Sequence, residues 1–169
     1  MIAPAYAQTM AAYDGELNRR LYAAAARLSD AARRSDGGAF FGSIHATLSH
    51  LLWADRMWMS RLAGWPRPAE TLATSTAMAG DFAELRAARE AADAGIADWA
   101  AALSQHWIDG GLTWHSGALG RDMTMPRATI VMHLFNHQTH HRGQVHALLT
   151  RAGERTGDTD LFAVLPQPG

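Results

Sequence analysis

Apolar residues recur at steps of three and four along four long stretches of this chain, and this spacing is typical of helices with one buried side. In the first stretch, for example, Tyr6, Met10, Tyr13 and Leu17 follow one another at such steps. Glycine and proline residues separate the stretches, as expected at helix ends. We therefore predict an all-α fold with four amphipathic helices, which cover approximately residues 4–28, 42–62, 81–105 and 126–151.

The connections between these helices predict further features. Residues Thr71–Ala79 form a link that is longer than a tight turn, which favours a crossover between the second and third helices. Two short alternating runs flank a glycine-containing loop within Gly110–Met125, so we expect a small hairpin before the fourth helix. The apolar segment Asp160–Pro166 is expected to dock onto the helices.

The composition limits the classes of function. The chain of 169 residues is long enough for one domain, and we expect residues 1–169 to form it. A net charge of −1 predicts no basic surface for nucleic acid or for an anionic membrane. All 15 cationic residues are arginine and there is no cysteine. These facts exclude a Schiff-base or P-loop lysine, a thiolate nucleophile and a disulfide.

Two further absences bear on the expected location of the protein. No apolar run is long enough to predict a transmembrane helix. The N-terminal segment lacks the charged and apolar regions of a signal peptide. We therefore expect a cytoplasmic protein.

Five of the nine histidines fall within residues 133–146, inside the predicted fourth helix. His137 and His141 are four residues apart, so a helix places both rings on the same side, where they can bind one metal ion. On a helical wheel they share that side with His133 and the aliphatic Ile130. A line of polar rings facing a core costs free energy unless each ring is hydrogen-bonded or binds a ligand. The pattern therefore favours a metal site over core histidines that bond to backbone or to one another.

A third ligand has to come from another helix, and the second helix offers His45, His50 and Asp55. The wheel places Asp55 near the centre of that helix's apolar side and His50 on its flank. Periodicity thus favours Asp55, but two histidines with one carboxylate and three histidines are both known metal-binding sets. The residues alone leave this choice open.

The same wheels predict outward-facing groups on both helices. On the fourth helix, Gln138, Arg142 and His146 lie on the side opposite the histidine pair. On the second helix, Trp53 lies away from the apolar side, where it is either covered by another element or part of a partner surface. We favour the partner surface and therefore expect a homodimer.

Two segments carry a resemblance to a known family that extends over almost the whole chain. They are GAFFGSIHATLSHLLWADRMW at residues 38–58 and HLFNHQTHHRGQ at residues 133–144. Here the chain resembles the DinB/YfiT-like, damage-inducible family of metal-dependent proteins. The resemblance implies a four-helix bundle with a crossover between the second and third helices. It also implies a divalent metal held by His50, His137 and His141, so that His50 replaces Asp55 as the expected third ligand.

Some relatives in this family are transferases and isomerases that use low-molecular-weight thiols. The resemblance therefore implies a thiol-dependent transferase or isomerase. An ion held by three histidines with an open position can also activate a water, so a hydrolase is a further form of the metalloenzyme that we expect. We expect zinc or nickel, with iron, cobalt or manganese as alternatives. Catalytic residues stay unassigned, and the neighbours expected to orient the ligands or handle protons are Asp55, His133, His140 and Gln144. The alternative is a non-catalytic, metal-binding, dimeric stress-response protein.

Overall fold

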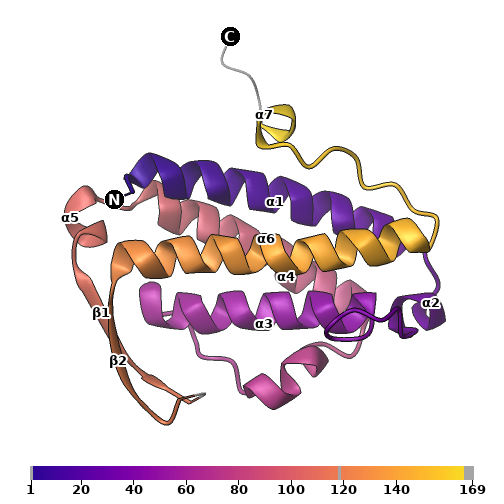
Figure 1. The fold of residues 1–169 in the computed structure, drawn as a ribbon, viewed down its shortest axis with the longest axis horizontal. Helices are drawn as coiled ribbons and strands as arrows, with labels where there is room; N and C mark the ends of the chain where they lie inside the picture. Colours follow the sequence, from indigo (N-terminus) through magenta and orange to yellow (C-terminus); the bar gives the residue numbers. More distant parts are fainter. Residues whose placement is uncertain (1, 118, 166–169) are drawn as a thin grey trace.

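Four long helices dominate the computed structural model, which describes residues 2–117 and 119–165 (Figure 1). They are α1 (Pro4–Ala26), α3 (Ile44–Leu62), α4 (Phe82–Ala101) and α6 (Arg127–Arg151). Shorter helical segments are α2 (Asp30–Arg34), the 3-10 helix η1 (Leu72–Ala77), α5 (Gln105–Ile108) and α7 (Leu161–Val164). The predominantly α-helical fold is confirmed, and each predicted long helix begins and ends within a few residues of the observed one.

Side chains at the helix starts explain where α3 and α4 begin. The Ser43 hydroxyl accepts a hydrogen bond from the Ala46 backbone N–H at 3.1 Å. Asp81 accepts hydrogen bonds from the N–H groups of Ala83 and Glu84. Such caps satisfy backbone N–H groups that have no partner within the first helical turn.

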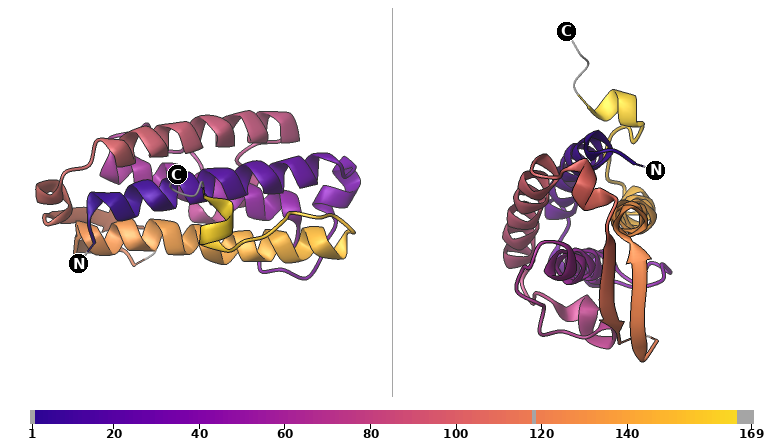
Figure 2. Two further views of the ribbon diagram at one scale, coloured as in Figure 1. Left: turned by 90° about the horizontal axis from the view of Figure 1, so that it is seen from above. Right: turned by 90° about the vertical axis from the view of Figure 1, so that its left-hand side faces the viewer.

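The long helices lie side by side in a square arrangement, which is clearest when the molecule is seen from one end (Figure 2). Helices α1 and α3 each contact both α4 and α6. Helices α1 and α6 run in one direction, whereas α3 and α4 run in the other (Figure 1). Because α3 and α4 run the same way, residues 63–81 return along the molecule, and η1 within this connection packs against α3.

A small antiparallel hairpin precedes α6, as the sequence predicts. Strand β1 (Gly111–Ser116) pairs along its whole length with β2 (Arg121–Pro126). The Trp114 ring of the hairpin packs edge-on against Trp58 of α3 at 5.5 Å, and Trp58 contacts His133 of α6 at 5.1 Å. The hairpin therefore lies beside the junction of α3 with α6.

Two large clusters make up most of the apolar core of the described residues, and a layer of charged and polar side chains separates them. On α1, α3 and α6 the layer residues fall between the residues of the two clusters. The layer contains Asp14, Asn18, Asp55, Arg89, Asp93, Gln138 and Arg142. Asp55 lies 2.5 Å from Arg89 and also accepts a hydrogen bond from Gln138. Burial raises the pKa of the Asp55 carboxyl to about 6, although the Arg89 guanidinium opposes this shift.

Two polar residues expected on the outer side of α6 are buried instead. Gln138 and Arg142 are each only 3% exposed, because α6 packs against α1 as well as against α3. Helix α6 is therefore buried on two sides, one towards α3 and one towards α1. A helical wheel centred on the histidines locates only the side towards α3. His146, predicted on the same side as Gln138, is half-buried, and its Nδ1 lies 2.6 Å from the Oγ1 of Thr156.

Of the two alternatives for Trp53, cover by another element is confirmed, and the favoured partner surface is not. Trp53 is 9% exposed, and its indole N–H donates a hydrogen bond to the Glu70 carbonyl at 2.8 Å. The connection between α3 and α4 covers this side of α3, which the wheel of a single helix cannot reveal. Trp53 therefore gives no support to the predicted homodimer.

The described part of the C-terminal segment docks onto α1, as expected. Val164 of α7 packs against Tyr13 and Leu17, and the Tyr13 hydroxyl donates a hydrogen bond to the Thr159 carbonyl at 2.5 Å. Pro166, the last residue of the predicted docking segment, lies outside the described residues.

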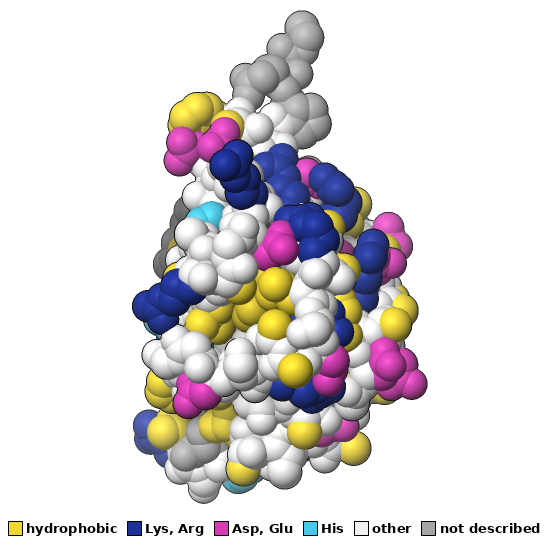
Figure 3. Space-filling model, turned by 90° about the vertical axis from the view of Figure 1, so that its right-hand side faces the viewer, with side chains coloured by type: hydrophobic (Ala, Val, Ile, Leu, Met, Phe, Trp, Pro, Cys, Tyr) yellow, Lys and Arg dark blue, Asp and Glu magenta, His cyan; other side chains and the backbone are white. Residues whose placement is uncertain are grey.

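The surface carries charges of both signs. At the end of the molecule shown in Figure 3, arginine and acidic side chains are interspersed. Among the described residues, Arg27 pairs with Glu154 at 2.5 Å and Arg34 with Asp30 at 2.8 Å. No helix in the described part of the chain combines the length and the apolar character that a membrane span needs.

Candidate metal centre

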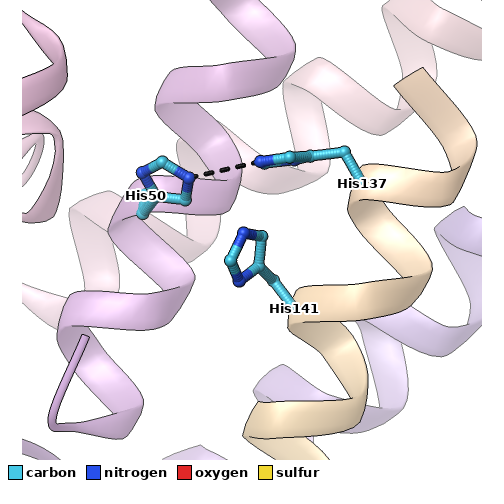
Figure 4. Close-up of side chains that lie close together, drawn as sticks. All are labelled: His50, His137 and His141. Atoms are coloured by element: carbon cyan, nitrogen blue, oxygen red, sulfur yellow. Dashed lines mark hydrogen bonds between the residues drawn. The ribbon is translucent and has the colours of Figure 1, made fainter. Parts of the chain in front are cut away.

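Three histidines from two helices converge where α3 meets α6. His50 comes from α3, whereas His137 and His141 come from α6 (Figure 4). The Nε2 atoms of His50 and His137 are 3.3 Å apart, and one ring nitrogen from each of the three residues lies within 4.8 Å of the others. These are the three residues to which the family resemblance points.

The packing of α3 explains why His50, rather than Asp55, meets the pair on α6. Helix α3 has α4 and α6 as neighbours, and residues five positions apart on a helix point in directions that differ by about 140°. Asp55 therefore points into the buried polar layer, where it meets Arg89 of α4 and Gln138 of α6, while His50 points towards the histidine pair of α6. On α6 the four-residue spacing brings the rings of His137 and His141 to a centroid distance of 4.5 Å.

The second ring nitrogen of His50 is held by the connection between α3 and α4. Its Nδ1 lies 2.9 Å from the Oγ of Ser75 in η1. The Ser75 hydroxyl donates its own proton to the Leu72 carbonyl at 2.8 Å, so towards His50 it acts as an acceptor. His50 therefore carries its proton on Nδ1 and leaves the lone pair of Nε2 free towards His137.

A glutamine holds His141 in the same way. The Nδ1 of His141 lies 2.8 Å from the Oε1 of Gln144, which can only accept a hydrogen bond. The amide nitrogen of Gln144 is in turn 3.3 Å from Nε2 of the exposed His140. His141 therefore also carries its proton on Nδ1, and its Nε2 is free to bind an ion.

The separation of one pair of ring nitrogens matches the spacing around a tetrahedral transition-metal ion. Zinc–nitrogen bonds of about 2.0–2.1 Å at tetrahedral angles place two nitrogens about 3.3–3.4 Å apart, and the two Nε2 atoms of His50 and His137 are 3.3 Å apart. Because His50 Nε2 is unprotonated, His137 donates the hydrogen bond across this contact. No hydrogen bond within the described residues fixes a proton on the Nδ1 of His137, so this ring can exchange the proton on Nε2 for an ion.

Burial keeps the three rings neutral at neutral pH, and neutral imidazole is the form that binds metals. It lowers the pKa of His137 to about 3 and that of His50 to about 4, and neighbouring histidines add to both shifts. The pKa of His141 is also lowered by burial, although its bond to Gln144 opposes the change. At neutral pH the rings therefore carry no positive charge that an ion would have to displace.

Comparison with known families finds a match to this sequence. A model described as the DinB family matches residues 1–167, a range that includes all three histidines and the elements from α1 to α7. The chain belongs to the DinB family. No curated protein and no solved structure matches it.

Aromatic rings flank the histidine cluster of this DinB-family protein on two sides. The Phe41 ring lies 4.0 Å from the ring of His50. On the other side Trp58 packs edge-on against His133, whose ring lies 5.8 Å from that of His137. These apolar rings displace water from around the imidazoles, which is the physical cause of their lowered pKa values.

The four predicted neighbours of the ligands have different surroundings. Gln144 bonds directly to His141. His133 and His140 are exposed. The His140 ring packs edge-on against that of His141 at a centroid distance of 4.8 Å, and its Nε2 lies 3.3 Å from the amide nitrogen of Gln144. Asp55 belongs to the buried polar layer, and none of its hydrogen bonds within the described residues goes to a histidine.

Two residues of the centre were not predicted from the sequence. Phe41 lies in the bend that precedes α3, next to Gly42, whose φ of 76° suits glycine. Glycines in this segment indicate a bend but not the ring that it places beside His50. Ser75 is 25 residues from His50 along the chain, in a segment whose composition indicates only a loop.

Proposed function

We propose that this DinB-family protein binds one divalent transition-metal ion through His50, His137 and His141 and keeps one coordination position open. The observation that carries the proposal is the convergence of three neutral imidazoles, two of them held with Nε2 unprotonated. Three nitrogen donors suit zinc or nickel, with iron, cobalt or manganese as alternatives. The packing of the four long helices supports assignment to a four-helix bundle with a crossover between α3 and α4.

As an enzyme, the protein would be a thiol-dependent transferase or isomerase, or a hydrolase. An ion held by three neutral ligands lowers the pKa of a water or thiol bound to it. Because the chain has no cysteine, any thiolate has to come from a low-molecular-weight cosubstrate. His133 and His140 are exposed beside the cluster, at centroid distances of 5.8 Å from His137 and 4.8 Å from His141, and we assign them proton transfer.

A non-catalytic role is the second candidate, and one observation favours it. The histidines come from α3 and α6, so an ion would tie two long helices together whether or not it took part in a reaction. In this proposal the protein is a dimeric, damage-inducible stress-response protein of the cytoplasm. Neither candidate includes nucleic-acid binding, because the net charge is −1.

Metal content tests both candidates. We expect protein purified without a histidine tag or a nickel column to carry about one equivalent of metal. His137→Ala should lose the ion, whereas His146→Ala should keep it, because His146 lies outside the cluster and contacts Thr156. Wild-type protein that neither contains metal nor can be loaded with it would overturn both candidates.

Reactivity separates the enzyme from the non-catalytic protein. We expect the metal-loaded protein to consume a thiol together with an electrophile from a panel of both, and His137→Ala to be inactive. His146→Ala is the matched control. Metal-loaded protein that is inert across the panel would favour the non-catalytic candidate, and DNA binding at moderate salt would contradict both.

A further inference from the structure

The connection between α3 and α4 reaches into the histidine cluster through one side chain. Ser75 of η1 is 0% exposed, and its Oγ lies 2.9 Å from the Nδ1 of His50. The same oxygen donates its proton to the Leu72 carbonyl at 2.8 Å. One hydroxyl thus joins the backbone of the connection to a proposed metal ligand on α3.

We propose that Ser75 is a positioning residue of the metal centre, and that the connection between α3 and α4 is thereby part of the site. The inference rests on the proposed metal binding by His50, His137 and His141. Ser75 keeps the proton of His50 on Nδ1, so that Nε2 presents a lone pair towards His137. Without this acceptor, either ring nitrogen of His50 can carry the proton, and a ring protonated on Nε2 cannot bind an ion through that atom.

Contacts on both sides of Ser75 hold the connection in place. At the start of η1, the Thr74 hydroxyl accepts a hydrogen bond from the Thr71 N–H at 2.9 Å and closes the turn. One residue before Thr71, the Glu70 carbonyl accepts the indole N–H of Trp53 at 2.8 Å. Trp53 follows His50 by three positions on α3, and its ring lies 5.7 Å from that of His50. The helix that carries the ligand therefore also anchors the segment that orients it.

A second serine offers a matched control. Ser60 of α3 donates to the Met57 carbonyl at 2.8 Å, which is the same bond to the residue three positions earlier that Ser75 makes with Leu72. The hydrogen bonds of Ser60 within the described residues include none to a histidine. Ser60→Ala therefore removes an equivalent local bond without touching the centre.

The test measures cobalt and zinc affinity of the full-length protein by competition with a chelator. We expect Ser75→Ala to bind each metal about tenfold or more weakly than the wild type, and Ser60→Ala to bind as the wild type does. Circular dichroism confirms that both variants are folded. If the wild type binds metal and Ser75→Ala binds it equally well, the inference is wrong while the proposed function stands. If the wild type binds neither metal, both fail.

The protonation pattern of the rings gives a second readout that a merely structural role of Ser75 would not change. Nitrogen-15 NMR of the metal-free wild type should show His50 protonated on Nδ1. In Ser75→Ala the His50 signal should shift towards the Nε2-protonated form, while His141, held by Gln144, keeps its own pattern. A wild-type His50 protonated on Nε2 would overturn the inference even if Ser75→Ala does not fold.

Discussion

His137 differs from the other two residues of the cluster in how its ring is held. Ser75 and Gln144 fix the rings of His50 and His141, whereas His137 has no such contact at Nδ1 within the described residues. Its pKa is nevertheless lowered to about 3, chiefly by burial. A group whose pKa differs between the folded and unfolded chains makes stability depend on pH.

This difference predicts acid sensitivity of the metal-free protein. Between pH 6.5 and about 3 the unfolded chain binds a proton at His137 that the folded protein does not, so stability falls as pH falls through this window. From pH 7 to pH 5 we expect the free energy of unfolding to fall by about 2 kcal/mol because of His137. Urea denaturation in the presence of a chelator, carried out at the two pH values, measures this fall.

The control for this prediction is His137→Asn. Over the same pH change, its free energy of unfolding should fall by about 2 kcal/mol less than that of the wild type. The comparison cancels other groups, such as Asp55, whose raised pKa acts in the opposite direction. An equal pH dependence in the two proteins would show that His137 is not desolvated in the folded state.

At the residue scale, the sequence predicts the part of the site that lies on one helix. The spacing of His137 and His141 is sufficient, because both belong to the same side of α6. His50 followed from the family resemblance, since the wheel of α3 pointed to Asp55. Ser75 could not be predicted, because its position depends on the path of a connection and not on a periodic pattern.

At the scale of the elements, the connection between α3 and α4 contacts both of the helices that it joins. Trp53 bonds Glu70 on the α3 side. On the α4 side, the Trp65 ring lies over Gly95, where an added Cβ would come within 2.7 Å of a ring carbon. Glycine at position 95 is therefore required by the close approach of this ring and not by helix geometry.

Replacing Gly95 by alanine should displace Trp65 and destabilise the protein by about 1–3 kcal/mol, in spite of the better helix propensity of alanine. Gly143 of α6 is the matched control, because a Cβ there meets no atom within 4 Å. Gly143→Ala should stabilise the protein by about 0.5–1 kcal/mol. Thermal unfolding of both variants checks this, and a stabilising Gly95→Ala would contradict the packing described.

The predictability of an element depends on its length. The long helices have several turns in which apolar residues repeat, and their bounds agree with the periodicity. The short helices α2, η1 and α5 contain four to six residues each, which is too few to show a period. The hairpin was recognised from alternation and a glycine-containing loop, which are local signals.

At the scale of the whole molecule, all four long helices meet in the polar layer between the two apolar clusters. Arg89 is central to it, because it pairs with Asp55 at 2.5 Å and with Asp93 at 2.8 Å. Arg142 makes a second buried pair with Asp14. Buried ion pairs of this kind add little net stability as pairs, but loss of one partner leaves an uncompensated charge.

Arg89→Met should therefore destabilise the protein by about 3–5 kcal/mol. The control is Arg86→Met on the same helix, where an exposed pair with Glu90 at 2.8 Å is lost, and its effect should stay below about 1 kcal/mol. Denaturant midpoints of the two variants provide the measurement. If Arg89→Met and Arg86→Met destabilised the protein by similar, small amounts, the polar layer around Arg89 would have to be hydrated in solution.

The chain has no cysteine and so cannot form a disulfide. His50 and His137 are 87 positions apart along the sequence, and an ion shared by them would close a loop of that length. Such a cross-link restricts the chain as a disulfide does, but it opens with chelation and closes with metal supply instead of responding to redox potential. The stability of the folded protein would then depend on the concentration of free metal in its surroundings.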